Sequence, residues 1–172
     1  PAESDAVSLR PPQYGGLFAV MSHWTTSRTA ATVVMPTGTG KTDTMIALLL
    51  TERCPRLLVL VPTDALREQL ANQFATLGIL PEALRLESLP TKPEYPVVGV
   101  LQRTPQSESD LRDYLRSCNV VVTTMALVSG WRKPLLEVLA REFSHVFIDE
   151  AHHIAAKRWG AVRDAHSQRP IA

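Results

Sequence analysis

The sequence has few cysteines, almost no net charge and no long apolar segment, and each absence excludes a class of protein. Two cysteines among 172 residues cannot form a framework of disulfides, so we expect a reducing, cytoplasmic location. The formal net charge of +1 provides no basic field that would attract nucleic acid from a distance. No apolar run approaches the ~20 residues that span a bilayer, and no signal peptide is present, so we expect no membrane partner.

The size of the chain limits it to one hydrophobic core. With 172 residues and 45% hydrophobic content, the chain can bury one good core. We therefore expect residues 1–172 to form a single domain. Since the chain begins with Pro1 rather than methionine, we expect this domain to be a fragment of a longer protein.

Residues 31–42 have the pattern of a loop that binds phosphate. The β-branched, apolar residues 31–35 predict a short buried strand, and the Ala- and Leu-rich residues 41–51 predict a helix. A loop that contains glycines and lies between a strand and a helix is the setting in which phosphate-binding loops occur. The residues that we expect to surround the phosphates are Thr37, Gly38, Thr39, Gly40, Lys41 and Thr42.

The residue types of this loop suit a magnesium-bound triphosphate. Gly38 and Gly40 let the backbone approach phosphate oxygens, and the start of the helix adds a partial positive charge. Lys41 would neutralise the β- and γ-phosphates, and the Thr42 hydroxyl would bind Mg²⁺. The strict pattern has glycine where this chain has Met35. The alternative is a glycine-rich turn ahead of an ordinary helix.

Two acidic residues follow another apolar strand about a hundred residues later. Residues 144–148 predict this strand, and Asp149 and Glu150 lie at its carboxyl end, where parallel α/β sheets bind their ligands. Asp149 could therefore reach the Mg²⁺ that Thr42 contacts, while Glu150 could orient and deprotonate an attacking water. The alternative is a helix N-terminus, where acidic residues are favoured by the helix dipole.

The histidines after the acidic pair do not have the spacing of a metal site. His152 and His153 are adjacent and cannot easily face one ion from a helix, and no cysteine or acid stands at ligand spacing. We interpret His152 as a polar residue that couples the acidic motif to its surroundings.

The pattern along the chain predicts an α/β fold, with strands and helices alternating. Such alternation is typical of a mainly parallel sheet sandwiched between helices in three layers. Residues 80–95 contain three prolines and predict a loop, and the helical region after residue 123 should break near Gly130 and Pro134. Trp24, Trp131 and Trp159 are interpreted as packing residues. The other expected strands cover residues 56–61, 96–101 and 119–123, and the other expected helices cover residues 64–77, 107–116 and 155–166.

These motifs, in this order, resemble the first RecA-like ATPase domain of superfamily-2 helicases and translocases. The group with the helicase subunits of type I and type III restriction enzymes is the most similar. Residues 35–42 resemble its motif I, and the Asp-Glu-Ala-His run of residues 149–152 resembles motif II. Residues 9–13 are similar to the motif that senses adenine, which would make Gln13 the adenine reader with Arg10 beside it. His152 would relay the state of the nucleotide to later motifs.

The resemblance also implies contacts with nucleic acid. Thr63, Thr123 and Thr124 follow predicted strands in segments that resemble two further motifs, and they would contact a nucleic-acid backbone. The alternative is that each threonine caps the helix that follows.

The resemblance implies ATP and Mg²⁺ as cofactors, and nucleic acid, DNA rather than RNA, as a partner of the full-length protein. The family's second RecA-like domain and its third motif are absent from this chain. We therefore expect residues 1–172 alone to bind ATP weakly and to hydrolyse it slowly. Two alternatives are a nucleotide-gated switch or scaffold without translocation and a small-molecule P-loop kinase. The position of the Asp-Glu-Ala-His run after a late strand argues against the kinase.

Overall fold

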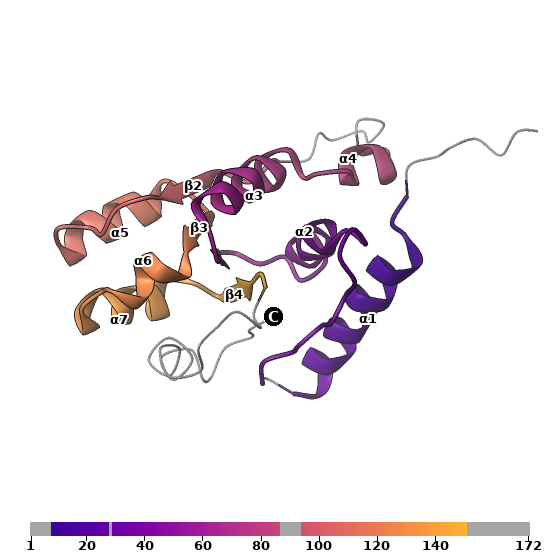
Figure 1. Ribbon diagram of the computed structural model, residues 1–172, viewed down its shortest axis with the longest axis horizontal. Helices are drawn as coiled ribbons and strands as arrows, with labels where there is room; N and C mark the ends of the chain where they lie inside the picture. Colours follow the sequence, from indigo (N-terminus) through magenta and orange to yellow (C-terminus); the bar gives the residue numbers. More distant parts are fainter. Residues whose placement is uncertain (1–7, 28, 87–93, 151–172) are drawn as a thin grey trace, which may run out of the picture.

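The computed structural model describes residues 8–27, 29–86 and 94–150 of the chain. Within these residues, strands alternate with one or two helices from residue 57 onward, as the sequence predicts, and no helix is both long and apolar enough to cross a membrane (Figure 1). The strands are β1 (Leu57–Val61), β2 (Val98–Leu101), β3 (Val120–Thr124) and β4 (His145–Ile148). The helices are α1 (Pro11–Thr26), α2 (Lys41–Thr51), α3 (Asp64–Thr76), α4 (Leu80–Ala83), α5 (Glu108–Arg116), α6 (Met125–Ser129) and α7 (Lys133–Glu142).

The four strands form one parallel sheet in the order β2-β3-β1-β4. Val59 in β1 lies beside Val122 of β3 on one side and beside Phe147 of β4 on the other. β1 and β3 are buried along their whole length, as expected for strands of a parallel sheet that helices cover on both faces. The parallel sheet predicted from the sequence is confirmed.

Helices cover the two faces of this sheet and complete three layers. Successive side chains of a strand point to opposite faces. Leu57, Val59 and Val61 pack into a core shared with α1, α2 and α3, whereas Leu58 and Leu60 pack into a core shared with α5, α6 and α7. Figure 1 shows these two groups of helices on opposite sides of the sheet. The α/β three-layer sandwich is therefore confirmed.

Most predicted boundaries agree with the structure within two residues. Ser107 caps α5, because its hydroxyl oxygen accepts the backbone N–H of Asp110 at 3.1 Å. The predicted break between α6 and α7 lies at Gly130, but Pro134 stands in the first turn of α7, where its missing N–H costs little. The predicted helix 155–166 lies outside the described residues.

Helix α1 is absent from the sequence-based prediction. Its start carries a recognisable signal, since Pro11 and Pro12 occupy the first two positions of the helix. Its apolar residues do not form one stripe, because Tyr14 is 43% exposed and Phe18 is 60% exposed. Periodicity of apolar residues therefore does not reveal this helix. The one-turn helix α4 lies within residues 80–95, where a loop is predicted.

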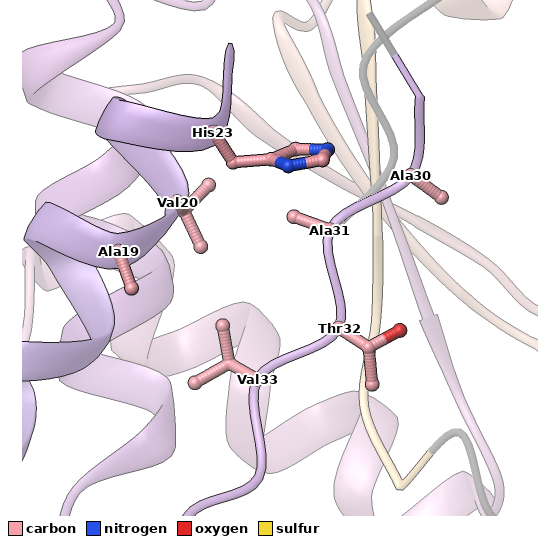
Figure 2. Close-up of a pocket in the computed structure, with 7 residues that line it drawn as sticks. All are labelled: Ala19, Val20, His23, Ala30, Ala31, Thr32 and Val33. Atoms are coloured by element: carbon pink, nitrogen blue, oxygen red, sulfur yellow. The ribbon is translucent and has the colours of Figure 1, made fainter. Parts of the chain in front are cut away.

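Residues 31–35 do not form a strand, contrary to the prediction. Val34 is 91% exposed, and the edge strand β4 pairs with β1 alone among the strands that the structure describes. β-branched residues favour an extended backbone, but a strand also needs the backbone of a neighbour to bond with. Figure 2 shows that the segment runs alongside α1, with a pocket between them. The volume of this pocket is about 240 Å³. The pocket is lined by Ala19, Val20, His23, Ala30, Ala31, Thr32 and Val33.

The tryptophans of the described residues contribute to packing, as predicted. Trp131 is 5% exposed and belongs to the core formed with α5, α6 and α7. Trp24 is partly buried, and its ring lies 5.8 Å from the ring of His145. Trp159 lies outside the described part of the chain.

Arg56 joins three elements at the amino edge of the sheet. Its guanidinium donates to Glu142 Oε2 of α7 at 2.5 Å and to the carbonyl oxygen of Leu115 near the end of α5. The last carbonyl oxygens of a helix have no partner within the helix. The backbone of Arg56 also exchanges two hydrogen bonds with the Ser144 hydroxyl. One side chain thus fixes the ends of two helices against β1.

Replacing Arg56 with alanine should lower the free energy of unfolding by about 2 kcal/mol, because two hydrogen bonds of a charged group are lost. Denaturant unfolding measures this change. Arg116→Ala is the matched control, since Arg116 is 74% exposed and pairs with a 70% exposed Asp113. It should change stability by less than about 0.5 kcal/mol. Equal effects of the two substitutions would contradict the structural role of Arg56.

Candidate active site

The loop of residues 36–40 turns sharply ahead of α2. Thr39 fixes the turn, because its backbone N–H and its hydroxyl donate to the carbonyl oxygen of Pro36 at 3.3 and 2.6 Å. Gly38 and Gly40 have φ angles of 79° and 86°, a left-handed backbone that glycine adopts readily. Lys41 is the first residue of α2. The unpaired N–H groups of the first helical turn therefore lie directly beside the loop.

Met35 stands where the strict phosphate-loop pattern has glycine, and its side chain lies close to α1 and α2. The Thr44 hydroxyl of α2 lies 3.7 Å from the Met35 sulfur and 3.2 Å from the carbonyl oxygen of Gly40, and it can donate its single hydrogen to either. A Cβ atom on Gly16 of α1 would lie 3.3 Å from the same sulfur. Met35 therefore occupies space beside the loop, and Gly16 leaves room for it.

Asp149 and Glu150 directly follow β4 at the carboxyl edge of the sheet. The backbone N–H of Asp149 donates to the carbonyl oxygen of Leu60 at 2.9 Å, which fixes Asp149 against β1. Glu150 has a φ of 54°, a left-handed conformation that costs a non-glycine residue roughly 1–2 kcal/mol. Backbone strain of this kind is concentrated at functional sites.

An ion pair connects the loop with the acidic pair. Lys41 Nζ lies 2.8 Å from Glu150 Oε1, although 109 positions separate the two residues in sequence. Both side chains are a little under one-third exposed, at 29% and 28%. Because solvent reaches both partners, the pair contributes only about 0.2–1 kcal/mol to stability. The lysine of the loop and the acids of β4 thus meet at one edge of the sheet.

The environment of Asp149 disfavours its negative charge. Asp149 is 8% exposed, and its burial raises the pKa of the carboxyl above the ordinary range. The negative charge of Glu150 raises this pKa further, while the positive charge of Lys41 and the backbone N–H of Glu150 act in the opposite direction. Thr42, a half-buried neighbour of Lys41 in α2, adds a hydroxyl. A buried carboxylate and a hydroxyl are oxygen ligands of the kind that magnesium prefers.

Arg10 and Gln13 contact the loop from the start of α1. Arg10 Nη1 donates to the carbonyl oxygen of Gly38 at 3.2 Å. Gln13 Nε2 donates to the carbonyl oxygen of Gly40 at 3.2 Å and to Asp43 Oδ2 at 3.1 Å. Gln13 Oε1 accepts the backbone N–H of Arg10 at 2.6 Å, and Gln13 as a whole is 1% exposed. Both side chains therefore bind the loop itself in this structure.

Asp43 is a residue of this site that the sequence-based prediction omits. It lies in the first turn of α2 and is half-buried. Acidic residues are common in the first turn of any helix because of the helix dipole. The pattern therefore does not distinguish Asp43 from an ordinary helix start, and only its contact with Gln13 identifies it.

The three predicted nucleic-acid residues all lie at the carboxyl ends of strands. Thr63 and Thr124 cap α3 and α6, because each hydroxyl oxygen accepts a backbone N–H of the following helix at 3.3 Å. Thr123 is fully buried, and its hydroxyl donates to the carbonyl oxygen of Leu101 at 3.0 Å. Thr63 is exposed. Contact of these residues with nucleic acid stays a prediction, and Thr63 is the most accessible of them.

Two further site residues are predicted from the sequence, Thr37 in the loop and His152 after the acidic pair. Thr37 is exposed in the turn of the loop. His152 lies outside the described residues.

The three-layer sandwich carries a glycine-bearing loop that leads into α2 and two acids that follow the parallel strand β4. This combination is that of a RecA-like P-loop domain. A family model described as the type III restriction enzyme, res subunit, matches residues 6–171. The chain belongs to this family. No curated protein sequence matches it.

Solved structures with the same fold include proteins of a phage and of Sulfolobus species. The UvsW helicase of bacteriophage T4 is 18% identical with a TM-score of 0.62, and the match covers 96% of this chain and 51% of that one. The Sulfolobus solfataricus SWI2/SNF2 ATPase core in complex with dsDNA is 21% identical with a TM-score of 0.64, over 97% and 32% of the two chains. A hypothetical ATP-dependent RNA helicase from Sulfolobus tokodaii is 19% identical with a TM-score of 0.60, over 98% and 46%. This chain therefore spans about half or less of each structure.

Replacing Asp149 with asparagine should raise the free energy of unfolding at pH 7 by about 1 kcal/mol, because the buried side chain no longer carries a disfavoured charge. The pKa of Asp149 is raised in the folded state. The ionised form therefore destabilises the fold above this pKa, and the penalty disappears as pH falls below the ordinary carboxyl range. The higher stability of Asp149→Asn relative to the wild type should therefore disappear over the same pH range.

Denaturant unfolding at several pH values, without divalent cations, measures this difference. Asp113→Asn is the control, because Asp113 is 70% exposed. It should change stability by less than about 0.5 kcal/mol at every pH. A loss of stability in Asp149→Asn at pH 7 would contradict the prediction.

Proposed function

We propose that this chain is the ATP-binding half of a nucleic-acid-dependent ATPase motor of the helicase or translocase type. The observation that carries the proposal is the 2.8 Å contact between Lys41 of the phosphate loop and Glu150 of the acidic pair. This contact joins an ammonium group, which can bind phosphate, to a carboxylate, which can activate water. Membership of the restriction-enzyme family supports the same proposal.

The loop would enclose the triphosphate. The backbone N–H groups of Thr37, Gly38 and Gly40 would surround phosphate oxygens, and that of Thr39 would join them on leaving the carbonyl oxygen of Pro36. The start of α2 would add its partial positive charge. Lys41 would contact the β- and γ-phosphates. Thr42 and Asp149 would hold Mg²⁺, which when bound neutralises charge on the phosphate oxygens.

Glu150 would act as the general base of hydrolysis. Its carboxylate would orient a water and accept a proton as the water oxygen bonds to the γ-phosphorus. The bond from that phosphorus to the bridging oxygen would break, releasing ADP and phosphate. His152 would relay this change to the rest of the motor. We expect Arg10 and Gln13 to contribute to nucleotide binding. Reading of adenine by Gln13 would require its amide to exchange the partners that it has here.

The Lys41–Glu150 pair would be the resting state of this site. An incoming triphosphate competes with Glu150 for the ammonium group of Lys41. Because the pair is partly exposed, it opposes binding by no more than about 1 kcal/mol. Release of Lys41 would allow Glu150 Oε1 to bind water.

The full-length protein would act on nucleic acid, and we propose DNA rather than RNA because the family is that of a restriction enzyme subunit. Nucleic acid would lie along the carboxyl edge of the sheet, where the exposed Thr63 is available. A second RecA-like domain in the same polypeptide would complete the ATP site. Residues 1–172 alone would therefore bind ATP weakly and hydrolyse it slowly. In this scheme the full-length protein is a cytoplasmic ATP hydrolase.

Replacing Lys41 with alanine in the full-length protein should weaken Mg-ATP binding at least tenfold, because the phosphates lose their charged partner. Glu150→Gln should bind Mg-ATP as the wild type does, or up to about fivefold tighter, because Lys41 is less strongly held. It should lose about a hundredfold or more of its DNA-stimulated turnover, because the general base is gone. Calorimetry and phosphate release measure the two effects.

The exposed pair of Lys133 and Glu137, 3.9 Å apart, supplies matched controls. Lys133→Ala and Glu137→Gln should leave ATP binding unchanged. A Lys41→Ala variant that binds ATP normally would refute the site. If Glu150→Gln keeps the full biological activity of the protein, the chain is a nucleotide-gated switch instead of a motor.

A further inference from the structure

The side-chain amide of Gln13 is held by three partners that leave it a single orientation. An amide nitrogen has two hydrogens to donate, and Gly40 and Asp43 take both. An ionised carboxylate accepts hydrogen bonds only, so Asp43 must face the nitrogen end of the amide. The backbone N–H of Arg10 donates only, so it must face the oxygen end, 2.6 Å away. The orientation of Gln13 thus follows from its surroundings.

Two glycines leave the space in which Gln13 and Asp43 meet. A Cβ atom on Gly40 would lie 2.0 Å from Gln13 Nε2, closer than any contact allows. A Cβ atom on Gly78, which follows α3, would lie 2.7 Å from Asp43 Oδ1. Three segments of the chain therefore converge on the carboxylate of Asp43: the start of α1, the first turn of α2 and the end of α3.

We propose that Asp43 is a positioning residue of the nucleotide site, whose carboxylate holds the amide of Gln13 against the carbonyl oxygen of Gly40. Gly40 is the last residue of the loop and precedes the first residue of α2. The Gly40 carbonyl oxygen already accepts the backbone N–H of Thr44 at 3.1 Å, and the Gln13 amide adds the contact that ties this carbonyl, and with it the loop and the start of α2, to α1. This inference rests on the proposed function, because it assigns Asp43 to the same ATP site.

The effect of Asp43 should not depend on the nucleotide base. Gln13 is 1% exposed and has both amide hydrogens engaged within the protein. Through Gln13, Asp43 acts on the loop that surrounds the phosphates. A nucleotide with a different purine should therefore lose as much affinity as ATP when Asp43 is changed.

The test compares Mg-ATP with Mg-ITP, which carries an oxygen in place of the purine amine, in the full-length protein. Calorimetry gives the dissociation constants for Asp43→Ala, Asp43→Asn, Gln13→Ala and the double variant with both alanines. Asp110→Ala is the matched control, because Asp110 is an exposed acid in the first turn of α5. Thermal unfolding checks that each variant is folded.

Asp43→Ala should weaken both nucleotides by the same factor, roughly tenfold, the scale of one hydrogen bond to a charged group. Asp43→Asn keeps an oxygen that can accept from Gln13 and should stay within about threefold of the wild type. Gln13→Ala should match Asp43→Ala. The double variant should be no weaker than either single variant, because residues that act through one contact are not additive. Asp110→Ala should bind as the wild type does.

Three results would overturn the role of Asp43. They are normal affinity in a folded Asp43→Ala variant, additive losses in the double variant, and a loss confined to ATP while ITP binding is unchanged. The Lys41→Ala variant separates this failure from failure of the proposed function. If Lys41→Ala weakens binding but Asp43→Ala does not, only the role of Asp43 is wrong. If Lys41→Ala also binds Mg-ATP normally, the proposed ATP site itself is wrong, and the proposed role of Asp43 fails with it.

Discussion

The meeting of Lys41 and Glu150 is the constraint on which the site depends, because the fold must bring two distant segments to one place. Lys41 is placed by a glycine-bearing turn and the start of α2, whereas Glu150 is placed by β4. The parallel sheet makes the meeting possible, since all its carboxyl ends lie along one edge. The two buried cores on either side of the sheet keep β1 and β4 in register.

The site is assembled at a cost in stability. Asp149 is buried where its charge is disfavoured, and Glu150 has a strained left-handed backbone. Neither feature helps the chain to fold, and both are typical of residues retained for chemistry. The rest of the described structure offsets the cost with apolar strands and with contacts such as those of Arg56, at the opposite edge.

Local patterns in the sequence predict much of this fold. They fail where the secondary structure of a segment depends on contact with another segment of the chain. The strands β1 and β3 are predictable, because short apolar runs bounded by turn residues are typical of buried parallel strands. Residues 31–35 have a similar composition but form no strand, because propensity cannot supply a neighbouring backbone. Helix α1 is the opposite case, since its apolar residues are spread around the helix and its proline start is the main local signal.

The sequence alone determines the chemical groups of the site and their order along the chain, from the phosphate loop to the acidic pair. These groups can be identified because turn glycines, a helix start and a strand end each leave a local pattern. Only the tertiary structure shows that Gln13 binds Gly40 and Asp43, and that the buried hydroxyl of Thr123 donates to the carbonyl oxygen of Leu101. Hydrogen-bond partners and burial depend on atoms that other segments bring near, and no local pattern of residues encodes them.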